Sequence, residues 1–460
     1  MSSIIGTIAL LHDFLWGIPA LVILVGGGIV LTFFIRGVQF TRFGFIMKKT
    51  FGSLFNKEEQ AKRKAVGISP VQALTAALGT TIGTGNIVGV GAAIAVGGPG
   101  ALFWMWICGF LAMAIKYSEV VLSVRYREKD PSGGYQAGPQ MYIKKGLKCA
   151  PVAFLIGVLM CFCMSALAAV HSSSVAGNLT TIGISPAVTC VILVIIVAYI
   201  AIGGMKRLVH ITEKMVPFMT VFYVVLSLIV IIPNIGKIGI ILAEIFKGAF
   251  TGQAAVGGFA GATLSATVRV GLARGVLSND AGLGGQAIIH SQADSIDHPS
   301  QQGMWSIFET FVDTIVVCTL TGLCILFTGV WQTGASGETL APSAMSSVIG
   351  VVGQYGCILA LVLFGLSSLI GIVDAIRVQA VTMFHNAVVG RAFQVLFILF
   401  VVGGCLLGMG TVLLIADTLN AIILFITMVC LILMGGQIRK LTREWFDNKG
   451  DLAAIEANRK

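Results

Sequence analysis

The sequence GTTIGTGN, residues 79–86, lies in the middle of an apolar segment, residues 77–96, that is long enough to cross a lipid bilayer. Its three glycines, three threonines and one asparagine weaken a helix and bring polar groups to a depth where lipid is expected. Close helix packing explains glycines four residues apart, but Gly83 and Gly85 are two apart and cannot share one helix face. We therefore expect a span made of two half-helices.

The whole chain has the composition of a polytopic membrane protein. Of its 460 residues, 56% are hydrophobic and 11% are charged, whereas a soluble domain carries about 25% charged residues. No catalytic dyad, metal cluster or nucleotide-binding motif indicates an enzyme. The ten cysteines lie mostly in apolar runs without CxxC spacing, so we expect them to be reduced packing residues.

Apolar runs predict an all-α protein with eleven spans. Their ranges are 14–35, 70–95, 100–124, 151–175, 186–203, 212–233, 252–273, 302–329, 346–374, 391–409 and 413–435.

Lys and Arg residues are concentrated in the loops 36–69 and 125–150, in the short turn 204–211 and in the C-terminal tail. The loops of the opposite side contain only Lys237 and Lys247. The positive-inside rule then places the N-terminus outside and the C-terminus in the cytoplasm. The net charge of +10 is therefore a topology signal rather than a nucleic-acid footprint.

Another span, with the sequence GQAAVGGFAGATLSATVRVG at residues 252–271, is interrupted by glycines in a similar way. It lies five spans after the first interrupted one. If 14–35 is an extra N-terminal helix, the other ten spans divide into repeats 70–233 and 252–435, followed by a cytoplasmic tail, 436–460. An odd number of spans gives the two repeats opposite orientations, which predicts an inverted-repeat transporter whose site lies at the two breaks.

The chemistry of such a site follows from the backbone. A helix broken inside the membrane has free N–H groups at one new end and free C=O groups at the other. The N–H end attracts an anion such as a carboxylate, and the C=O end offers oxygen ligands to sodium. Irregular backbone at this depth is tolerated only within the protein or beside a cavity.

Six motifs of the chain resemble the alanine/glycine:cation symporter family, also called the sodium:alanine symporters. They are ALGTTIGTGNIVGV (77–90), VGGPGALFWMW (96–106), KYSE (116–119), TGQAAVGGFAGAT (251–263), ARGVLSNDAGLG (273–284) and DTIVVCT (313–319). The resemblance extends from about residue 15 to 435. It implies a LeuT-type five-plus-five fold with one extra N-terminal helix. It also implies sodium-coupled import of a small neutral amino acid by alternating access, across a bacterial or archaeal cytoplasmic membrane.

LeuT-type neurotransmitter:sodium symporters also break their first core helix at a G-x-G-N sequence. This likeness implies substrate contacts at Gly83, Thr84, Gly85 and Asn86, with the backbone N–H groups of Thr84 and Gly85 on the substrate carboxylate.

The same likeness implies two sodium ions as coupling ions and no other cofactor. One ion takes the carbonyl of Thr81 and the side chain of Asn86. The residues implied as ligands of the second ion are Gly79, Ile82, Ser367 and Ser368. For the two serines, hydrogen bonds from the hydroxyl groups back to their own helix are an equally weighted alternative.

From the seventh span we expect Phe259, Gly261 and Thr263 at the site. Phe259 is placed as a wall of the substrate pocket, with packing as its alternative role. Thr263 is placed as a ligand of substrate or sodium.

The fourth span departs from the family pattern, which has Gln where this chain has His171 in the stretch AAVHSSSVAGN, 168–178. The ninth span ends in GIVDAIRV, 371–378, another departure. We expect His171 and the adjacent Ser172 to contact substrate. A proton-coupled transporter that uses His171 is the alternative function, and a neutral histidine bonded to a carbonyl or serine is the structural one. The exact substrate, the stoichiometry and the oligomeric state stay open.

Other charged residues within spans are expected to have structural roles. Lys116 and Glu119 are three apart and are expected to pair with each other. Asp374 and Arg377 have the same spacing at the expected end of the ninth span, where they form either an inner gate or a solvated helix end.

Two segments outside the spans are also assigned. The basic, amphipathic segment 35–55 is expected along the inner membrane surface, with a solvated loop as its alternative. Residues 273–299 are expected to form a cytoplasmic loop in which Arg274 and Asp280 make gate contacts, or a plain connection.

Overall fold

The computed structural model describes residues 2–55, 67–130, 134–251 and 263–457. This part of the chain is mostly helical, with a short antiparallel hairpin of β1 (Glu128–Lys129) and β2 (Tyr135–Gln136). Among these residues, seven helices are long and apolar enough to cross a membrane, or nine if two bent helix pairs are each counted as one span. The predicted helical, multi-pass architecture is confirmed at this level.

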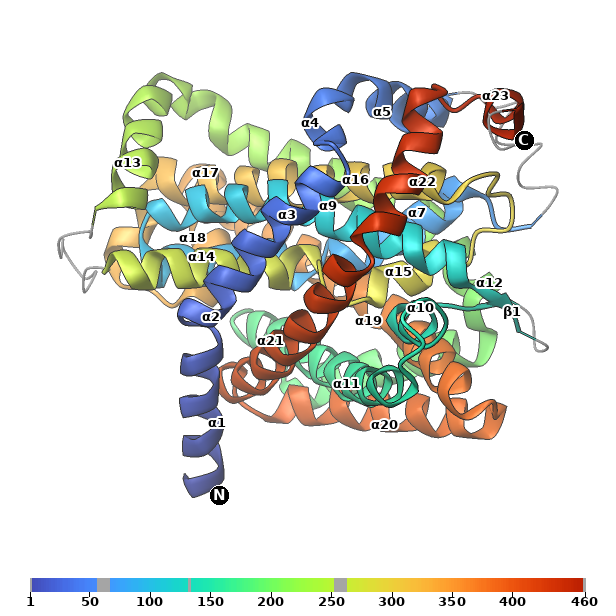
Figure 1. Cartoon of the computed structure of the whole chain (residues 1–460). Coiled ribbons are helices and arrows are strands. Elements are labelled where there is room, and N and C mark those ends of the chain that lie inside the picture. Colours follow the sequence, from blue (N-terminus) through green and yellow to red (C-terminus); the bar gives the residue numbers. More distant parts are fainter. Residues whose placement is uncertain (1, 56–66, 131–133, 252–262, 458–460) are drawn as a thin grey trace.

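The N-terminal part begins with α1 (Ser2–Leu15), which projects from the body in Figure 1. A bend of 41° separates it from a helical stretch that ends at Phe34. The elements of that stretch are α2 (Ile18–Leu21), the π-helical η1 (Val22–Gly26) and α3 (Gly27–Phe34). The basic segment predicted along the membrane surface then forms α4 (Val38–Thr41), α5 (Phe43–Lys49) and the 3-10 helix η2 (Phe51–Phe55).

The predicted pair of half-helices around GTTIGTGN is confirmed. α7 (Pro70–Thr81) starts at a capping box, in which the Ser69 side chain accepts from the backbone N–H of Gln72. A 3-10 turn, η3 (Thr84–Asn86), separates it from α8 (Val88–Gly97), and the two half-helices are bent by 58°.

The rest of the first half contains long helices, α9 (Gly100–Tyr126), α11 (Ala150–Thr180) and α12 (Pro186–Ile231), with the shorter α10 (Pro139–Gly146), η4 (Ile232–Lys237) and α13 (Ile238–Phe250). The predicted turn 204–211 is wrong. The chain changes direction at Gly204 alone, with φ +59°, and the helix resumes at once. Glycine adopts this positive φ without the penalty of a Cβ atom.

The interruption predicted within 252–271 falls mainly on residues 252–262, which lie outside the described residues. A further break lies at residues 280–284, between α14 (Leu264–Asn279), which extends past the predicted end of the span at 273, and α15 (Gly285–His290). Asp280 ends α14 in the left-handed conformation, with φ +60°, and Gly284 precedes α15 with φ +78°. The predicted cytoplasmic loop 273–299 is therefore wrong, because helix and break occupy most of it.

After the break the chain is again mostly helical. A continuous stretch consists of α16 (Pro299–Thr310), the π-helical η5 (Phe311–Cys318) and α17 (Thr319–Thr328). The following elements are η6 (Val330–Thr333), α18 (Gly337–Ile349), α19 (Val351–Phe384), α20 (Ala387–Leu406), α21 (Met409–Leu433), α22 (Gly435–Asp447) and α23 (Leu452–Ala457). Because α19 is longer than predicted, Asp374 lies inside it, fully buried and 3.0 Å from Arg377 Nε. The expected solvated helix end is wrong.

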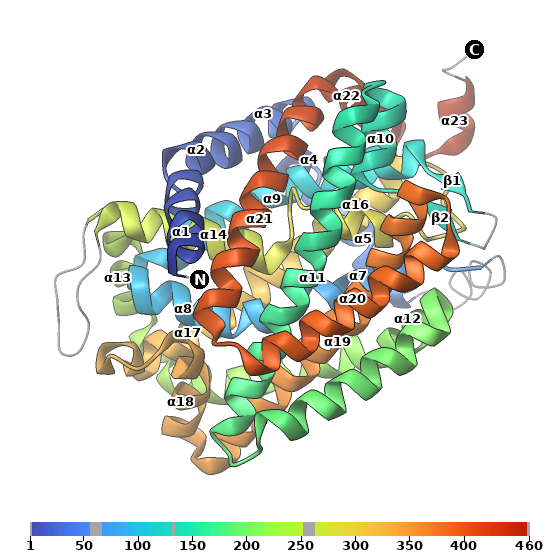
Figure 2. The same ribbon diagram turned by 90° about the horizontal axis from the view of Figure 1, so that it is seen from below.

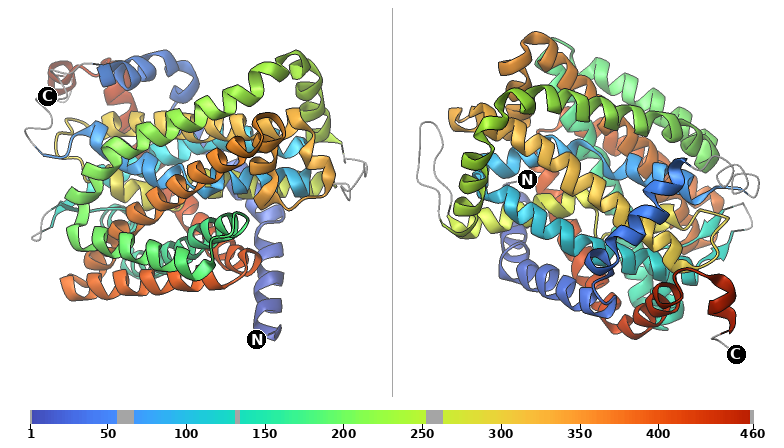
Figure 3. Two further views of the ribbon diagram at one scale, coloured as in Figure 1. Left: turned by 180° about the vertical axis from the view of Figure 1, so that it is seen from behind. Right: turned by 90° about the horizontal axis from the view of Figure 1, so that it is seen from above.

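The long helices enclose both breaks. α9, α14 and α16 lie side by side across the centre of Figure 1, and α11 and α20 lie below them. Figure 2 shows the face formed by α11, α19, α20 and α21, and Figure 3 shows α12 crossing the back of the molecule. α13 and α18 lie at one end, and the hairpin lies at the other. α7 lies among these helices, in contact with α12, α15, α16 and α19.

Candidate substrate and cation site

The carbonyl end of α7 carries backbone oxygens that have no hydrogen-bond partner within the helix. The last bond within the helix runs from Ile82 N to Leu78 O, at 2.8 Å. Gly83 N turns away and donates to Asn86 Oδ1 at 2.9 Å. The four carbonyls of residues 79–82 therefore receive no N–H from a following turn of the helix. Three of them, at Gly79, Thr81 and Ile82, are the carbonyls that the sequence predicted as cation ligands.

Two serines of α19 meet this end of α7. Ser368 Oγ is 3.1 Å from the carbonyl of Thr80, and Ser367 Oγ is 3.5 Å from that of Ile82. Both hydroxyls also lie near the carbonyl of Phe364 in their own helix, at 2.8 Å for Ser367 and 3.1 Å for Ser368. Both roles considered from the sequence thus agree with the geometry, because a hydroxyl that donates one bond keeps its oxygen lone pairs for an ion.

Gly83 is held where no side chain fits. A Cβ atom there would lie 2.5 Å from Ser368 Oγ and 2.9 Å from His171 Cε1. The next residue, Thr84, has its hydroxyl 2.9 Å from His171 Nδ1. α11 thus brings His171 to the break of the first helix, as the sequence predicted.

Thr84, Gly85 and His171 line a cavity of about 20 Å³ together with Arg274, Leu277 and Met409. A second cavity of about 20 Å³ lies beside Thr80, Asp280 and Gln286. Each has room for about one water molecule. Binding of an amino acid in this region therefore requires the surrounding helices to move apart.

A buried carboxylate lies beside the first break. Asp313 Oδ1 accepts from Asn86 Nδ2 at 2.7 Å, and Asp313 Oδ2 accepts from Ser278 Oγ at 2.9 Å and Thr314 Oγ1 at 2.8 Å. Asp313 is fully buried, and no cationic side chain pairs with it in the described part of the chain. The sequence analysis missed this role, although a carboxylate within a predicted span is itself a signal of function. Ser278 was missed because it was assigned to a loop.

One residue that lines the first cavity, Arg274, belongs to an ion pair. Arg274 Nη2 donates to Asp417 Oδ2 of α21, and the second guanidinium nitrogen, Nη1, has no hydrogen-bond partner among the described residues. Arg274, for which a gate contact was expected, thus forms an ion pair, and it lies in α14 instead of a loop. Asp280 instead accepts from Gln286 Nε2 at 3.2 Å.

Several expected positions differ. Ser172 donates to the carbonyl of Ala169 and lies close to Gly404 of α20, so it faces away from the break. Thr263 caps the exposed start of α14, where its hydroxyl accepts from Ala266 N, and thus does not lie at the second break. Phe259 and Gly261 lie outside the described residues.

The expected pair of Lys116 and Glu119 is wrong. Lys116 Nζ is 2.7 Å from Glu309 Oε1, whereas Glu119 Oε2 accepts from Gly282 N at 3.0 Å. The two side chains point to different neighbours, because α9 packs against α16 and against the break after α14. Glu119 thus accepts a hydrogen bond from the second break, and Lys116 forms an ion pair with Glu309, which lies near the first.

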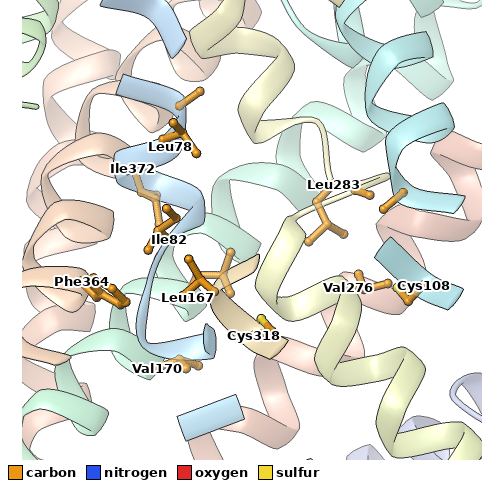
Figure 4. Packing of buried hydrophobic residues seen from close by; sticks show 14 of the residues in the cluster. Leu78, Ile82, Cys108, Leu167, Val170, Val276, Leu283, Cys318, Phe364 and Ile372 are labelled. Atoms are coloured by element: carbon orange, nitrogen blue, oxygen red, sulfur yellow. The ribbon is translucent and has the colours of Figure 1, made fainter. Parts of the chain in front are cut away.

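Apolar side chains surround these polar groups. Figure 4 shows Leu78 of α7, Ile82 directly after it, Leu167 of α11, and Phe364 and Ile372 of α19 around the first break. All five are buried. Such surroundings lower the effective dielectric constant, which strengthens the attraction between an ion and its ligands.

Comparisons with known proteins agree on one family. A model of the sodium:alanine symporter family matches residues 1–457. The sodium/alanine symporter AgcS of Methanococcus maripaludis is 35% identical over 456 residues, which cover 96% of each chain. The transporter YflA of Bacillus subtilis is 35% identical over 445 residues, 95% of this chain and 93% of that one. The probable sodium/glutamine symporter GlnT of the same organism is 33% identical, over 79% of this chain and 74% of that one.

A solved structure also matches the fold. The crystal structure of MhsT in complex with L-phenylalanine has a TM-score of 0.59, covering 83% of this chain and 98% of MhsT. The two sequences are 11% identical, so this likeness concerns the fold alone.

Proposed function

We propose that this chain, which belongs to the sodium:alanine symporter family, uses sodium as its coupling ion and a small neutral amino acid as its substrate. Its family makes it a membrane transporter that couples amino acids to a cation, and not an enzyme. Alanine, glycine or a close relative is the substrate class. Transport proceeds by alternating access, with the ion and the substrate carboxylate bound together at the broken helix α7–α8.

The single observation that carries the proposal is the uncompensated carboxylate of Asp313. A buried charge is costly unless it is paired, and Asp313 receives hydrogen bonds from Asn86, Ser278 and Thr314 but no cationic side chain in the described residues. A bound cation supplies the missing charge. Oxygen ligands suit sodium, and among the described residues no group of three or more His, Cys, Asp and Glu is placed to hold another metal.

We assign two cation positions. The first is formed by the Thr81 carbonyl, Asn86, Ser278 and Asp313. The second is formed by Gly79, Ile82, Ser367 and Ser368. The first lies beside the N–H groups of Thr84 and Gly85, which we assign to the substrate carboxylate. An ion and a carboxylate that share one site each lower the electrostatic cost of binding the other, and this provides the coupling.

The rest of the substrate lies against His171, whose Nδ1 is 2.9 Å from Thr84 Oγ1. The sodium/alanine and sodium/glutamine names of two relatives support an amino acid that carries no net side-chain charge.

We infer eleven spans in two inverted five-helix repeats, residues 70–233 and 252–435, after one N-terminal helix and before a cytoplasmic tail, 436–460. Two features support this division. α7–α8 opens the first repeat, α14–α15 opens the second, and both are interrupted. The Lys and Arg distribution supports an outside N-terminus and a cytoplasmic C-terminus in a prokaryotic plasma membrane.

Uptake of radiolabelled alanine, glycine and glutamine into proteoliposomes tests the proposal. An inward sodium gradient should stimulate uptake of at least one of them. A proton gradient without sodium should not. Stimulation by protons alone would support the proton-coupled alternative, in which His171 carries the proton, and would overturn sodium coupling. A lack of stimulation by sodium for any neutral amino acid would refute the proposal.

A further inference from the structure

Four elements meet at one buried carboxylate that the proposed cation ligands do not include. Glu309 of α16 is fully buried, as are Lys116 of α9 and His290 of α15, and Thr81 at the end of α7 is 4% exposed. Lys116 Nζ donates to Glu309 Oε1 at 2.7 Å, and His290 Nε2 is 2.8 Å from Glu309 Oε2. The hydroxyl of Thr81 also donates to Glu309 Oε1.

The charges within this cluster balance. Gln302 Nε2 lies 2.7 Å from His290 Nδ1, so the amide donates to Nδ1 and the Nε2–H of a neutral imidazole donates to Glu309. One ammonium and one carboxylate remain. No cation is needed to neutralise Glu309, in contrast to Asp313, and the cluster is not a further ion site.

Stability alone does not account for the pair of Lys116 and Glu309. Removing two charges from water costs free energy that their attraction often fails to recover, and apolar replacements of a buried pair are frequently as stable. Within a membrane span such charges mark function. The function that we assign to Glu309 is to fix the position of Thr81 at the end of α7.

The hydroxyl of Thr81 is also 3.0 Å from the carbonyl of Ala77 in its own helix. A hydroxyl has one proton, and a carboxylate is the stronger acceptor. The bond to Glu309 thus fixes the residue whose carbonyl is a proposed ligand of the first cation. At the neighbouring position, Thr80 Oγ1 is 2.8 Å from Gln286 Oε1 of α15.

We propose that Glu309 is a positioning residue for the cation site: through Thr81 it orients the carbonyl end of α7, and through His290 it ties that end to α15. This inference rests on the proposed sodium site. The Glu309 carboxylate, paired with Lys116, accepts from Thr81 of α7 and from His290 of α15. Cation binding at α7 is then coupled mechanically to α15.

The first test compares sodium dependence of uptake in three variants. Thr81→Val removes the hydroxyl and keeps the carbonyl, and we expect the sodium concentration for half-maximal uptake to rise about tenfold with little change in the maximal rate at saturating sodium. Thr81→Ser restores the hydroxyl and should restore the wild-type value. Thr75→Val is the matched control, because among the described residues the Thr75 hydroxyl bonds only to Gln72 O, within α7.

The second test is a double-mutant cycle. The paired change Lys116→Met with Glu309→Leu removes both charges of this ion pair, so folding is expected to be retained. It should raise the sodium requirement as Thr81→Val does, and adding Thr81→Val to it should have no further effect. Hydrogen–deuterium exchange of the peptide that contains residues 285–290 should become faster in the paired variant.

Three results would overturn the inference. They are a wild-type sodium requirement in Thr81→Val, a full additional effect of Thr81→Val in the Lys116→Met/Glu309→Leu background, or unchanged exchange of residues 285–290. A wild-type protein that sodium does not stimulate would instead refute the proposed function, so the two failures are distinguishable.

Discussion

Asn86 Nδ2 and Asp313 Oδ1 lie 2.7 Å apart, and this contact joins the first broken helix to the π-helical segment η5. The Asn86 amide also donates to the backbone carbonyl of Asp313 at 3.1 Å, and Asn86 Oδ1 accepts from Gly83 N at 2.9 Å. A π-helical turn changes the direction in which side chains leave a helix, and such turns are frequent at functional sites. One amide thus connects the turn at the break to a carboxylate that lacks a cationic partner in the described residues.

The charge of Asp313 should set the affinity for sodium. Asp313→Asn keeps the size of the side chain and removes the charge. We expect the sodium concentration for half-maximal uptake to rise at least about tenfold, which corresponds to about 1.4 kcal/mol. Sodium titration of uptake in proteoliposomes measures this.

Asp447→Asn is the control for this prediction. Asp447 pairs with Arg36 at a partly exposed surface, 2.6 Å away, and loss of an exposed pair has little effect. Equal sodium requirements for Asp313→Asn and the wild type would exclude Asp313 from the cation site.

Gly83 should not tolerate a side chain. In Gly83→Ala, the Cβ atom would meet Ser368 Oγ at 2.5 Å and His171 Cε1 at 2.9 Å, and such overpacking costs about 1–3 kcal/mol. Because both neighbours belong to the site, we expect uptake to fall by at least about tenfold, measured at equal amounts of folded protein.

Gly403→Ala in α20 is the matched change for Gly83→Ala, since a Cβ atom there meets nothing within 4 Å. It should leave transport unchanged and keep or raise the unfolding temperature, because alanine favours a helix interior more than glycine. Transport at the wild-type rate by Gly83→Ala would contradict the close approach.

The first break was predictable from the sequence, and the second was not. The second interruption was predicted at 257–265, most of which lies outside the described residues, and 279–285 was not singled out. The break at 280–284 depends on the left-handed conformation of Asp280 and on the buried Glu119, which accepts from Gly282 N. Glu119 is distant from Gly282 in the sequence, so the local pattern around 279–285 could not predict this contact.

The buried charges show the same limit. Spacing predicted Lys116 with Glu119 and Asp374 with Arg377, and only the second pair forms. In α9, contacts with α16 and the second break override the local spacing. The α7 carbonyls were predictable because a break inside a membrane span leaves them without helical partners, and His171 was singled out by its departure from the family pattern. Asp313 and Ser278 depend on how α14 and η5 pack together.

His171 should influence substrate choice. His171→Gln keeps a hydrogen-bonding side chain of similar length but changes the shape of the wall beside Thr84. We expect a change of about fivefold or more in the ratio of alanine to glutamine uptake, measured by competition, with the sodium requirement kept. Ser165→Ala in the same helix is the control, because Ser165 bonds only to Cys161 O. An unchanged ratio and an unchanged pH profile would exclude His171 from substrate selection.

The ion pair of Arg274 and Asp417 should serve both stability and transport. Both side chains are largely buried, and removing one partner of a buried pair costs about 3–5 kcal/mol because the other charge is left alone. Arg274→Gln and Asp417→Asn should each lower the unfolding temperature in detergent by several degrees. Arg269→Gln is the control from the same helix, because its pair with Asp13 is exposed, and we expect little change.

The paired change Arg274→Met with Asp417→Leu separates the two roles of this ion pair. It removes both charges, so it should recover most of the lost stability. The uptake rate of this paired variant should nevertheless stay below that of the wild type, because Arg274 lines the cavity beside Thr84 and its Nη1 is available to other acceptors. Thermal unfolding and initial uptake rates of the same preparations measure both effects. Wild-type uptake in the paired variant would mean that the ion pair only stabilises the fold and takes no part in closing the site.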